Sequence, residues 1–105
     1  MADDVMSRIK SLIDQNKVLI FMKGTPSLPM CGFSAATVEV LNELGVPFTG
    51  VNVLEDPELR EAIKVYSKWP TIPQVYVNGE FIGGCDIVQE MHARGELKPL
   101  VSAAA

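Results

Sequence analysis

The sequence contains few cysteines and no long apolar stretch. Its two cysteines, Cys31 and Cys85, are too few for the disulfide framework of a small secreted domain. No run of about 18 apolar residues occurs, which excludes a membrane-spanning helix. Internal repeats and linker-like segments are also absent. With 105 residues, of which 48% are hydrophobic and 21% charged, we expect residues 1–105 to form a single soluble domain.

Basic residues are scarce as well, with 9 Lys and Arg against 13 Asp and Glu and a formal net charge of −4. This balance argues against nucleic acid as a partner, since phosphate binding requires a basic face. The first residues, Met1 to Asp4, are acidic, whereas a targeting peptide would be basic or apolar there. We therefore expect a cytoplasmic protein or, as the alternative, the mature form of a mitochondrial or plastid protein.

Apolar periodicity and turn signals predict four helices and four strands. The Asn78-Gly79 pair is the strongest signal for a two-residue hairpin turn. The expected helices start after a cap at Asp3 or Asp4, after Cys31, after Asp56 and at Cys85, and they end at Asn16, Gly45, Ser67 and Arg94. The expected strands are Val18–Met22, Phe48–Val53, Gln74–Val77 and Glu80–Ile82, with a long loop at Lys23–Met30 and a short turn at Leu97–Val101.

The order of these elements predicts an α/β fold. The first two strands flank a helix, so they should be parallel with a right-handed crossover, and the last two should be antiparallel. The natural packing is a four-stranded mixed sheet flanked by helices on both faces.

Cys31 is the first candidate for chemistry. It precedes a helix, whose free N–H groups favour a thiolate. Ser34 occupies the position where a Cys-x-x-Cys pair would have its second sulfur. Cys31 must therefore react with a sulfur from another molecule or from Cys85, or bind a metal. A small buried side chain is the structural alternative, but Gly32 favours access by another molecule. Phe33 is compatible with a core position or an exposed contact.

Two further segments have features of binding sites. A cis peptide bond at Pro73 would let Ile72 offer its backbone to an outside strand, although a proline that ends an edge strand is the alternative. The glycines before Cys85 and Asp86 open a helix whose N-terminus suits a carboxylate. Asp86 could bond an ammonium group or cap the helix. For Cys85 we favour a packed thiol over a redox sulfur or a metal ligand.

Two cations complete the candidate site. Lys23 ends the first strand, and Arg60 lies in a first helical turn, where a cation is poorly placed for the helix dipole. Both residues are candidates for binding a ligand, with solvent exposure as the alternative.

Four motifs in this order and spacing resemble the monothiol, CGFS-type glutaredoxins over nearly the whole chain. The motifs are Lys23-Gly24-Thr25-Pro26, Cys31-Gly32-Phe33-Ser34, Trp69-Pro70-Thr71-Ile72-Pro73-Gln74 and Gly83-Gly84-Cys85-Asp86. The resemblance implies a thioredoxin-like fold. It also implies that Cys31 is the active thiolate and an iron ligand.

The resemblance further implies a glutathione site. Lys23 and Arg60 would bind the glycine carboxylate, and Ile72, beside a cis Pro73, would pair with the cysteinyl residue. The γ-glutamyl end would lie at the start of the last helix, at Gly84, Cys85 and Asp86.

Proteins of this family bind a [2Fe–2S] cluster, which requires four thiolates. Cys31 from two chains and two glutathione thiolates would supply them, so the resemblance implies a cluster-bridged homodimer. Such a protein would take the cluster from an iron–sulfur scaffold and deliver it to apo-proteins. The family also pairs with BolA-like proteins, which no residue here indicates independently.

Two alternatives remain open at this point. A glutathione-dependent reductase of mixed disulfides needs a single thiol, and we expect low turnover from this motif and from the long loop before Cys31. A redox sensor would instead form a disulfide between Cys31 and Cys85, which requires Cα atoms within about 7 Å.

Overall fold

The computed structural model describes residues 3–104, with side chains for residues 4–102. Its main sheet has the order β4-β1-β5-β6, and a small second sheet pairs β2 with β3. No helix in the described part is long and apolar enough to cross a membrane. The helices are α1 (Asp3–Gln15), α2 (Gly32–Leu44), α3 (Pro57–Ser67), α4 (Cys85–Ala93) and α5 (Leu97–Ala104), with a 3₁₀ turn at Val53–Glu55. The strands are β1 (Val18–Met22), β2 (Gly24–Thr25), β3 (Leu28–Pro29), β4 (Thr49–Asn52), β5 (Gln74–Val77) and β6 (Glu80–Gly83).

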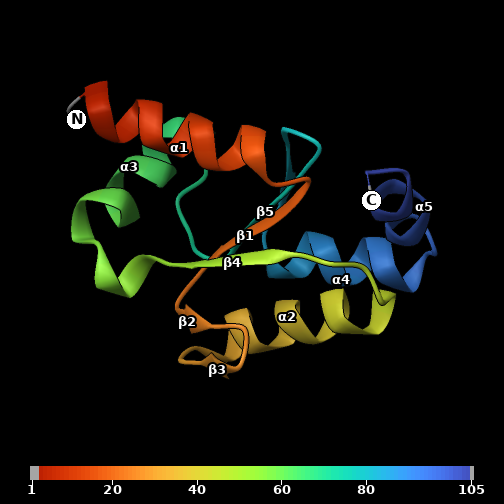
Figure 1. The fold of residues 1–105 in the computed structure, drawn as a ribbon. Helices are drawn as coiled ribbons and strands as arrows, with labels where there is room; N and C mark the ends of the chain where they lie inside the picture. Colours follow the sequence, from red (N-terminus) through yellow and green to blue (C-terminus); the bar gives the residue numbers. More distant parts are fainter. Residues whose placement is uncertain (1–2, 105) are drawn as a thin grey trace.

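The directions of the four main strands are as the sequence predicts. Strand β1 runs parallel to β4 and antiparallel to β5, and β5 and β6 form an antiparallel hairpin. In Figure 1, α1 and α3 lie on one side of this sheet, and α2 and α4 lie on the other. The predicted α/β architecture, a four-stranded mixed sheet flanked by helices on both faces, is confirmed.

The central strand β1 supplies side chains to both layers, because successive side chains of a strand point to opposite faces. All five of its residues are buried. Val18, Ile20 and Met22 pack with α2, α4 and α5. Leu19 and Phe21 pack with α1 and α3. This two-sided burial explains why the strand is a continuous apolar run.

Local signals place several element boundaries where the sequence predicts them. Asp56 caps α3 by accepting a hydrogen bond from the Leu59 N–H at 3.1 Å. Gly45 ends α2 in the left-handed conformation, with φ of 72°. Asn78 and Gly79 both have positive φ, as a two-residue hairpin turn requires.

Three details differ from the prediction. The Lys23–Met30 segment contains the β2–β3 hairpin, because long-range contacts hold it: Gly24 N–H donates to Asn52 Oδ1 at 2.9 Å. Helix α5 replaces the expected short turn, since Leu97 and Val101 are fully buried in the core. Asp4 lies inside α1 and is not its cap, and the side chain of Asp3 is outside the described part.

Gly50 on β4 allows the hairpin to approach the sheet. A methyl group at this position would lie 2.6 Å from Pro26 Cγ and 3.2 Å from Met22 Sδ. We therefore expect Gly50→Ala to lower the free energy of unfolding by about 1–3 kcal/mol, as overpacking does. Urea unfolding measures this change. Gly32→Ala is the control, because nothing lies within 4 Å of the added methyl group. Equal destabilisation by the two changes would contradict the packing argument.

Candidate functional site

A cavity of about 410 Å³ opens where β1 ends, α2 and α4 begin, and the segment before β5 passes. Every residue that the sequence predicted for the site lines it, although these residues are spread over more than half of the chain. The lining residues are Lys23, Cys31, Phe33, Arg60, Lys64, Trp69, Pro70, Thr71, Ile72, Pro73, Gly84, Cys85, Asp86 and Ile87.

Cys31 is the N-cap residue of α2 and has an extended backbone. Its thiol is partly exposed. The backbone N–H of Ser34 is the main cause that lowers the pKa of this thiol, and the Phe33 N–H and the charge of Lys23 act in the same direction. Burial of the thiol opposes this effect. Cys31 is therefore an accessible thiol with enhanced thiolate character, which is the form that attacks disulfides and binds metals.

Ser34 does more than replace a second cysteine, because its side chain also has a structural function. Its side chain is fully buried, and its Oγ accepts a hydrogen bond from the Lys23 N–H at 3.1 Å. This bond joins the end of β1 to the first turn of α2, so Lys23 and Cys31 are held near each other. Phe33, by contrast, is 65% exposed, which decides for an exposed position over a core one.

The segment before β5 forms one wall of the cavity. The Ile72–Pro73 peptide bond is cis, as the family resemblance implies, and both residues are buried. Trp69, Pro70 and Thr71 precede them in the same wall. The sequence motif that contains these three residues predicts no binding role for them, so their contribution to the cavity is a finding of the structure.

The start of α4 forms the adjoining wall, since a methyl group at Gly84 would lie 3.3 Å from the Pro73 carbonyl oxygen. Gly84 is the N-cap residue, and no side chain caps this helix end. Asp86 is therefore not a cap, and its exposed carboxylate lies in the first turn of α4. Cys85 is buried, which agrees with a packed thiol, and both cysteines are free. The unpaired N–H groups of this helix end favour an anionic group in the cavity.

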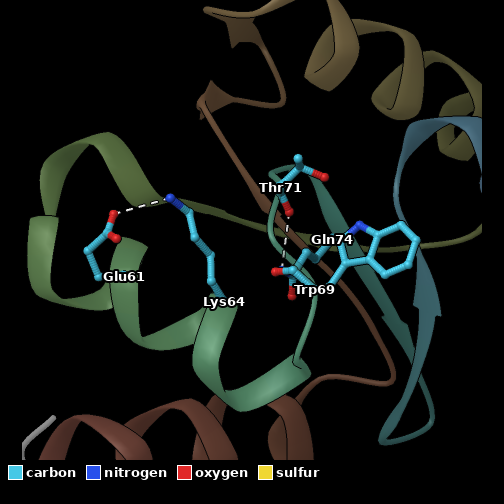
Figure 2. A network of polar contacts seen from close by, with 5 residues as sticks. All are labelled: Glu61, Lys64, Trp69, Thr71 and Gln74. Atoms are coloured by element: carbon cyan, nitrogen blue, oxygen red, sulfur yellow. Dashed lines mark hydrogen bonds and ion pairs between the residues drawn. The ribbon is translucent and has the colours of Figure 1, made fainter.

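Three cationic side chains line the same cavity: Lys23, Arg60 and Lys64. Among the described residues, Arg60 Nε is one of two buried side-chain atoms without a hydrogen-bond partner. Lys64 Nζ lies 3.2 Å from Glu61 Oε2 (Figure 2). The sequence analysis missed Lys64. Its spacing of four from Arg60 was an available signal, because residues at i and i+4 share one face of a helix.

The Glutaredoxin family model matches residues 18–82. An uncharacterized monothiol glutaredoxin, ycf64-like, from Synechocystis sp. is 53% identical over 104 residues, covering 99% of this chain and 97% of the relative. The mitochondrial monothiol glutaredoxin-5 of Saccharomyces cerevisiae is 51% identical over 107 residues, covering 99% and 71%. The chain belongs to the monothiol glutaredoxins.

Solved glutaredoxins show the same architecture. The reduced apo form of poplar GrxS14 has a TM-score of 0.83 and 46% identity, with 95% of this chain and 92% of that chain covered. The holo form of glutaredoxin C1 from Populus tremula x tremuloides has a TM-score of 0.88 and 31% identity, with 98% and 100% covered. The predicted thioredoxin-like fold of this monothiol glutaredoxin is thus confirmed.

The charge of Lys23 contributes to the lowered pKa of Cys31, so we expect Lys23→Gln to raise that pKa. The rate of alkylation by iodoacetamide, measured against pH, gives the thiol pKa, because only the thiolate reacts. Both proteins carry Cys85→Ser, so that a single thiol remains. The midpoint should move to higher pH in the variant. An unchanged or lower midpoint would show that Lys23 does not stabilise the thiolate.

Proposed function

We propose that this monothiol glutaredoxin binds glutathione in the cavity and carries a [2Fe–2S] cluster, its cargo, between two copies of the chain. The observation that carries this proposal is the position of an accessible, thiolate-prone Cys31 on a cavity with three cations and a free helix N-terminus. Residues 1–105 act as one domain in this proposal.

The chemistry of glutathione fits the walls of the cavity. Its glycine carboxylate would lie with Lys23 and Arg60, and Lys64 adds a third charge on that side. Its γ-glutamyl carboxylate would meet the backbone N–H groups at Gly84 and Cys85. Asp86 would bond its ammonium group. The backbone of Ile72, beside the cis Pro73, would pair with the cysteinyl residue between them. A volume of about 410 Å³ lies within the range of small-ligand sites.

The cluster needs four thiolates, and one chain presents a single accessible cysteine. Within residues 3–104, no three His, Cys, Asp or Glu side chains form a metal-binding group. Two Cys31 thiolates and two glutathione thiolates would complete the set, so we infer a homodimer in the loaded state. Met30 and Phe33 flank Cys31 and are 66% and 65% exposed, and they would contact the second copy.

Delivery requires partners on both sides of the transfer. We propose an iron–sulfur scaffold as donor, apo-proteins as recipients and, as in the family, a BolA-like protein as an additional partner. We propose that this protein acts in the cytoplasm; relatives named as mitochondrial and chloroplastic support the alternative, a mature form in such an organelle. Nucleic acids and membranes are not among the proposed partners.

The accessible thiolate also favours a second candidate function, the reduction of mixed disulfides between glutathione and proteins. Cys31 would attack the glutathione sulfur, form a Cys31–glutathione disulfide and release the protein thiolate. A second glutathione thiolate would then regenerate Cys31 and leave as oxidised glutathione. We expect this reaction to be slow compared with that of glutaredoxins whose loop before the active cysteine is shorter.

Anaerobic reconstitution with iron, sulfide and glutathione tests the main proposal. We expect a brown, glutathione-dependent dimer by visible absorbance and size-exclusion chromatography. Cys31→Ser should abolish both the colour and the dimer, whereas Cys85→Ser, the matched control, should retain them. A colourless wild-type monomer that still reduces glutathionylated substrates would show that the protein acts as a reductase and not as a cluster carrier.

Arg60 offers a separate test of the glutathione site. Loss of a charged hydrogen bond costs about 1.5–3 kcal/mol, so Arg60→Gln should weaken the binding of reduced glutathione about tenfold or more. Titration calorimetry measures this affinity. The control is Arg94→Gln, because Arg94 pairs with Glu90 at 2.7 Å and does not line the cavity. Equal affinities of the two variants would show that the glycine carboxylate of glutathione does not bind at Arg60.

A further inference from the structure

Gln74 is a polar side chain in the core. It is fully buried, one of three buried polar residues in the part of the chain that the structure describes. It is the first residue of β5 and directly follows the cis Pro73. A buried amide is tolerated only where its donors and acceptor have partners, so its hydrogen bonds indicate what it does.

The amide of Gln74 joins the core to the cavity wall. Its Nε2 donates to the backbone carbonyls of Trp69 and Thr71, each at 3.2 Å. Figure 2 shows Gln74 behind the Trp69 and Thr71 segment, with its amide directed at that backbone. On the other side, Gln74 Oε1 accepts a hydrogen bond from the Tyr76 hydroxyl at 3.3 Å. Both amide hydrogens are therefore used on one cavity-lining segment.

Tyr76 is held firmly by its surroundings. It is 2% exposed and packs edge-on against Phe21, with ring centroids 5.7 Å apart. The ring centroids of Tyr76 and Phe81 are 5.3 Å apart. Burial raises the pKa of Tyr76 to about 12, so the hydroxyl keeps its proton at neutral pH. The aromatic cluster thus fixes Gln74 Oε1 through the Tyr76 hydroxyl. Gln74 Nε2 in turn holds the backbone carbonyls of Trp69 and Thr71.

The position of the segment decides the shape of the cavity. The Trp69 indole packs on Phe81 with centroids 5.7 Å apart. A methyl group at Gly84 would lie 3.3 Å from Trp69 Nε1, so the indole closely approaches the wall formed by α4. Among the described residues, Trp69 Nε1 is the second buried side-chain atom without a partner. A shift of Trp69 would therefore change the space between the two walls.

We propose that Gln74 is a positioning residue, whose amide holds the Trp69–Thr71 backbone in place and thereby sets the affinity of the cavity for glutathione. This inference rests on the proposed glutathione site. Gln74 does not line the cavity, so its effect on the ligand is transmitted through the backbone of the segment that it bonds.

The most direct test is Gln74→Glu. This variant keeps the shape of the side chain but replaces the amide nitrogen, which donates to the Trp69 and Thr71 carbonyls, with an oxygen. Trp69 is the only tryptophan of the chain, so its fluorescence reports on this segment. We expect the variant to show a shifted Trp69 emission, greater quenching by acrylamide and roughly tenfold weaker binding of reduced glutathione by calorimetry, since buried donors are lost. Should this variant not fold, Gln74→Met removes the same bonds without adding a charge, and the same result is expected.

Val101→Ala is the matched control for a loss of stability. Val101 is fully buried in α5 and belongs to the core cluster on one face of the sheet, whereas Tyr76 belongs to the cluster on the other face. The control should unfold at lower urea concentration but keep the wild-type emission and affinity. A folded Gln74 variant with wild-type affinity would overturn the inference while leaving the glutathione site intact. If the wild-type protein itself fails to bind glutathione, the proposed site and this inference fall together.

Discussion

The two-sided burial of β1 is the constraint on which the rest of the structure depends. Its alternating side chains enter both cores, so the strand fixes the helices on each face of the sheet. Its end also fixes the site, because the Lys23 N–H bonds Ser34 at the start of α2. The reactive Cys31 therefore sits on a rigid junction between strand and helix. This explains how a serine in place of a second cysteine contributes directly to the architecture of the site.

The site combines several weak electrostatic effects of the backbone and side chains. The α2 N-terminus directs the Ser34 and Phe33 N–H groups at the Cys31 thiol, the α4 N-terminus at Gly84 has no side-chain cap, and three cations line the cavity. These groups favour a thiolate and carboxylates, which are the groups that glutathione carries. The protein thus supplies positions and charges, while under the proposed function the ligand supplies the additional sulfur that a [2Fe–2S] cargo requires.

Features determined by short-range sequence signals could be predicted, and those determined by distant contacts could not. The Asp56 cap, the Asn78-Gly79 turn and the placement of Cys31 before a helix each depend on adjacent residues. The β2–β3 hairpin instead depends on Asn52, far along the chain, and α5 depends on burial of Leu97. Gln74 was missed for the same reason, since its role follows from hydrogen bonds to the cavity-lining backbone. Lys64 was missed although its spacing of four from Arg60 was a short-range signal.

Amide chemical shifts measured during titration with reduced glutathione show whether glutathione occupies the cavity beside Cys31. We expect the largest shifts on Ile72, Cys85 and Asp86 and on the Trp69 indole N–H. A second, smaller cavity of about 220 Å³, lined by Lys17 and Thr49 among others, provides an internal reference that should not respond. Shifts concentrated at that second cavity, or no shifts at saturating glutathione, would mean that glutathione does not bind beside Cys31.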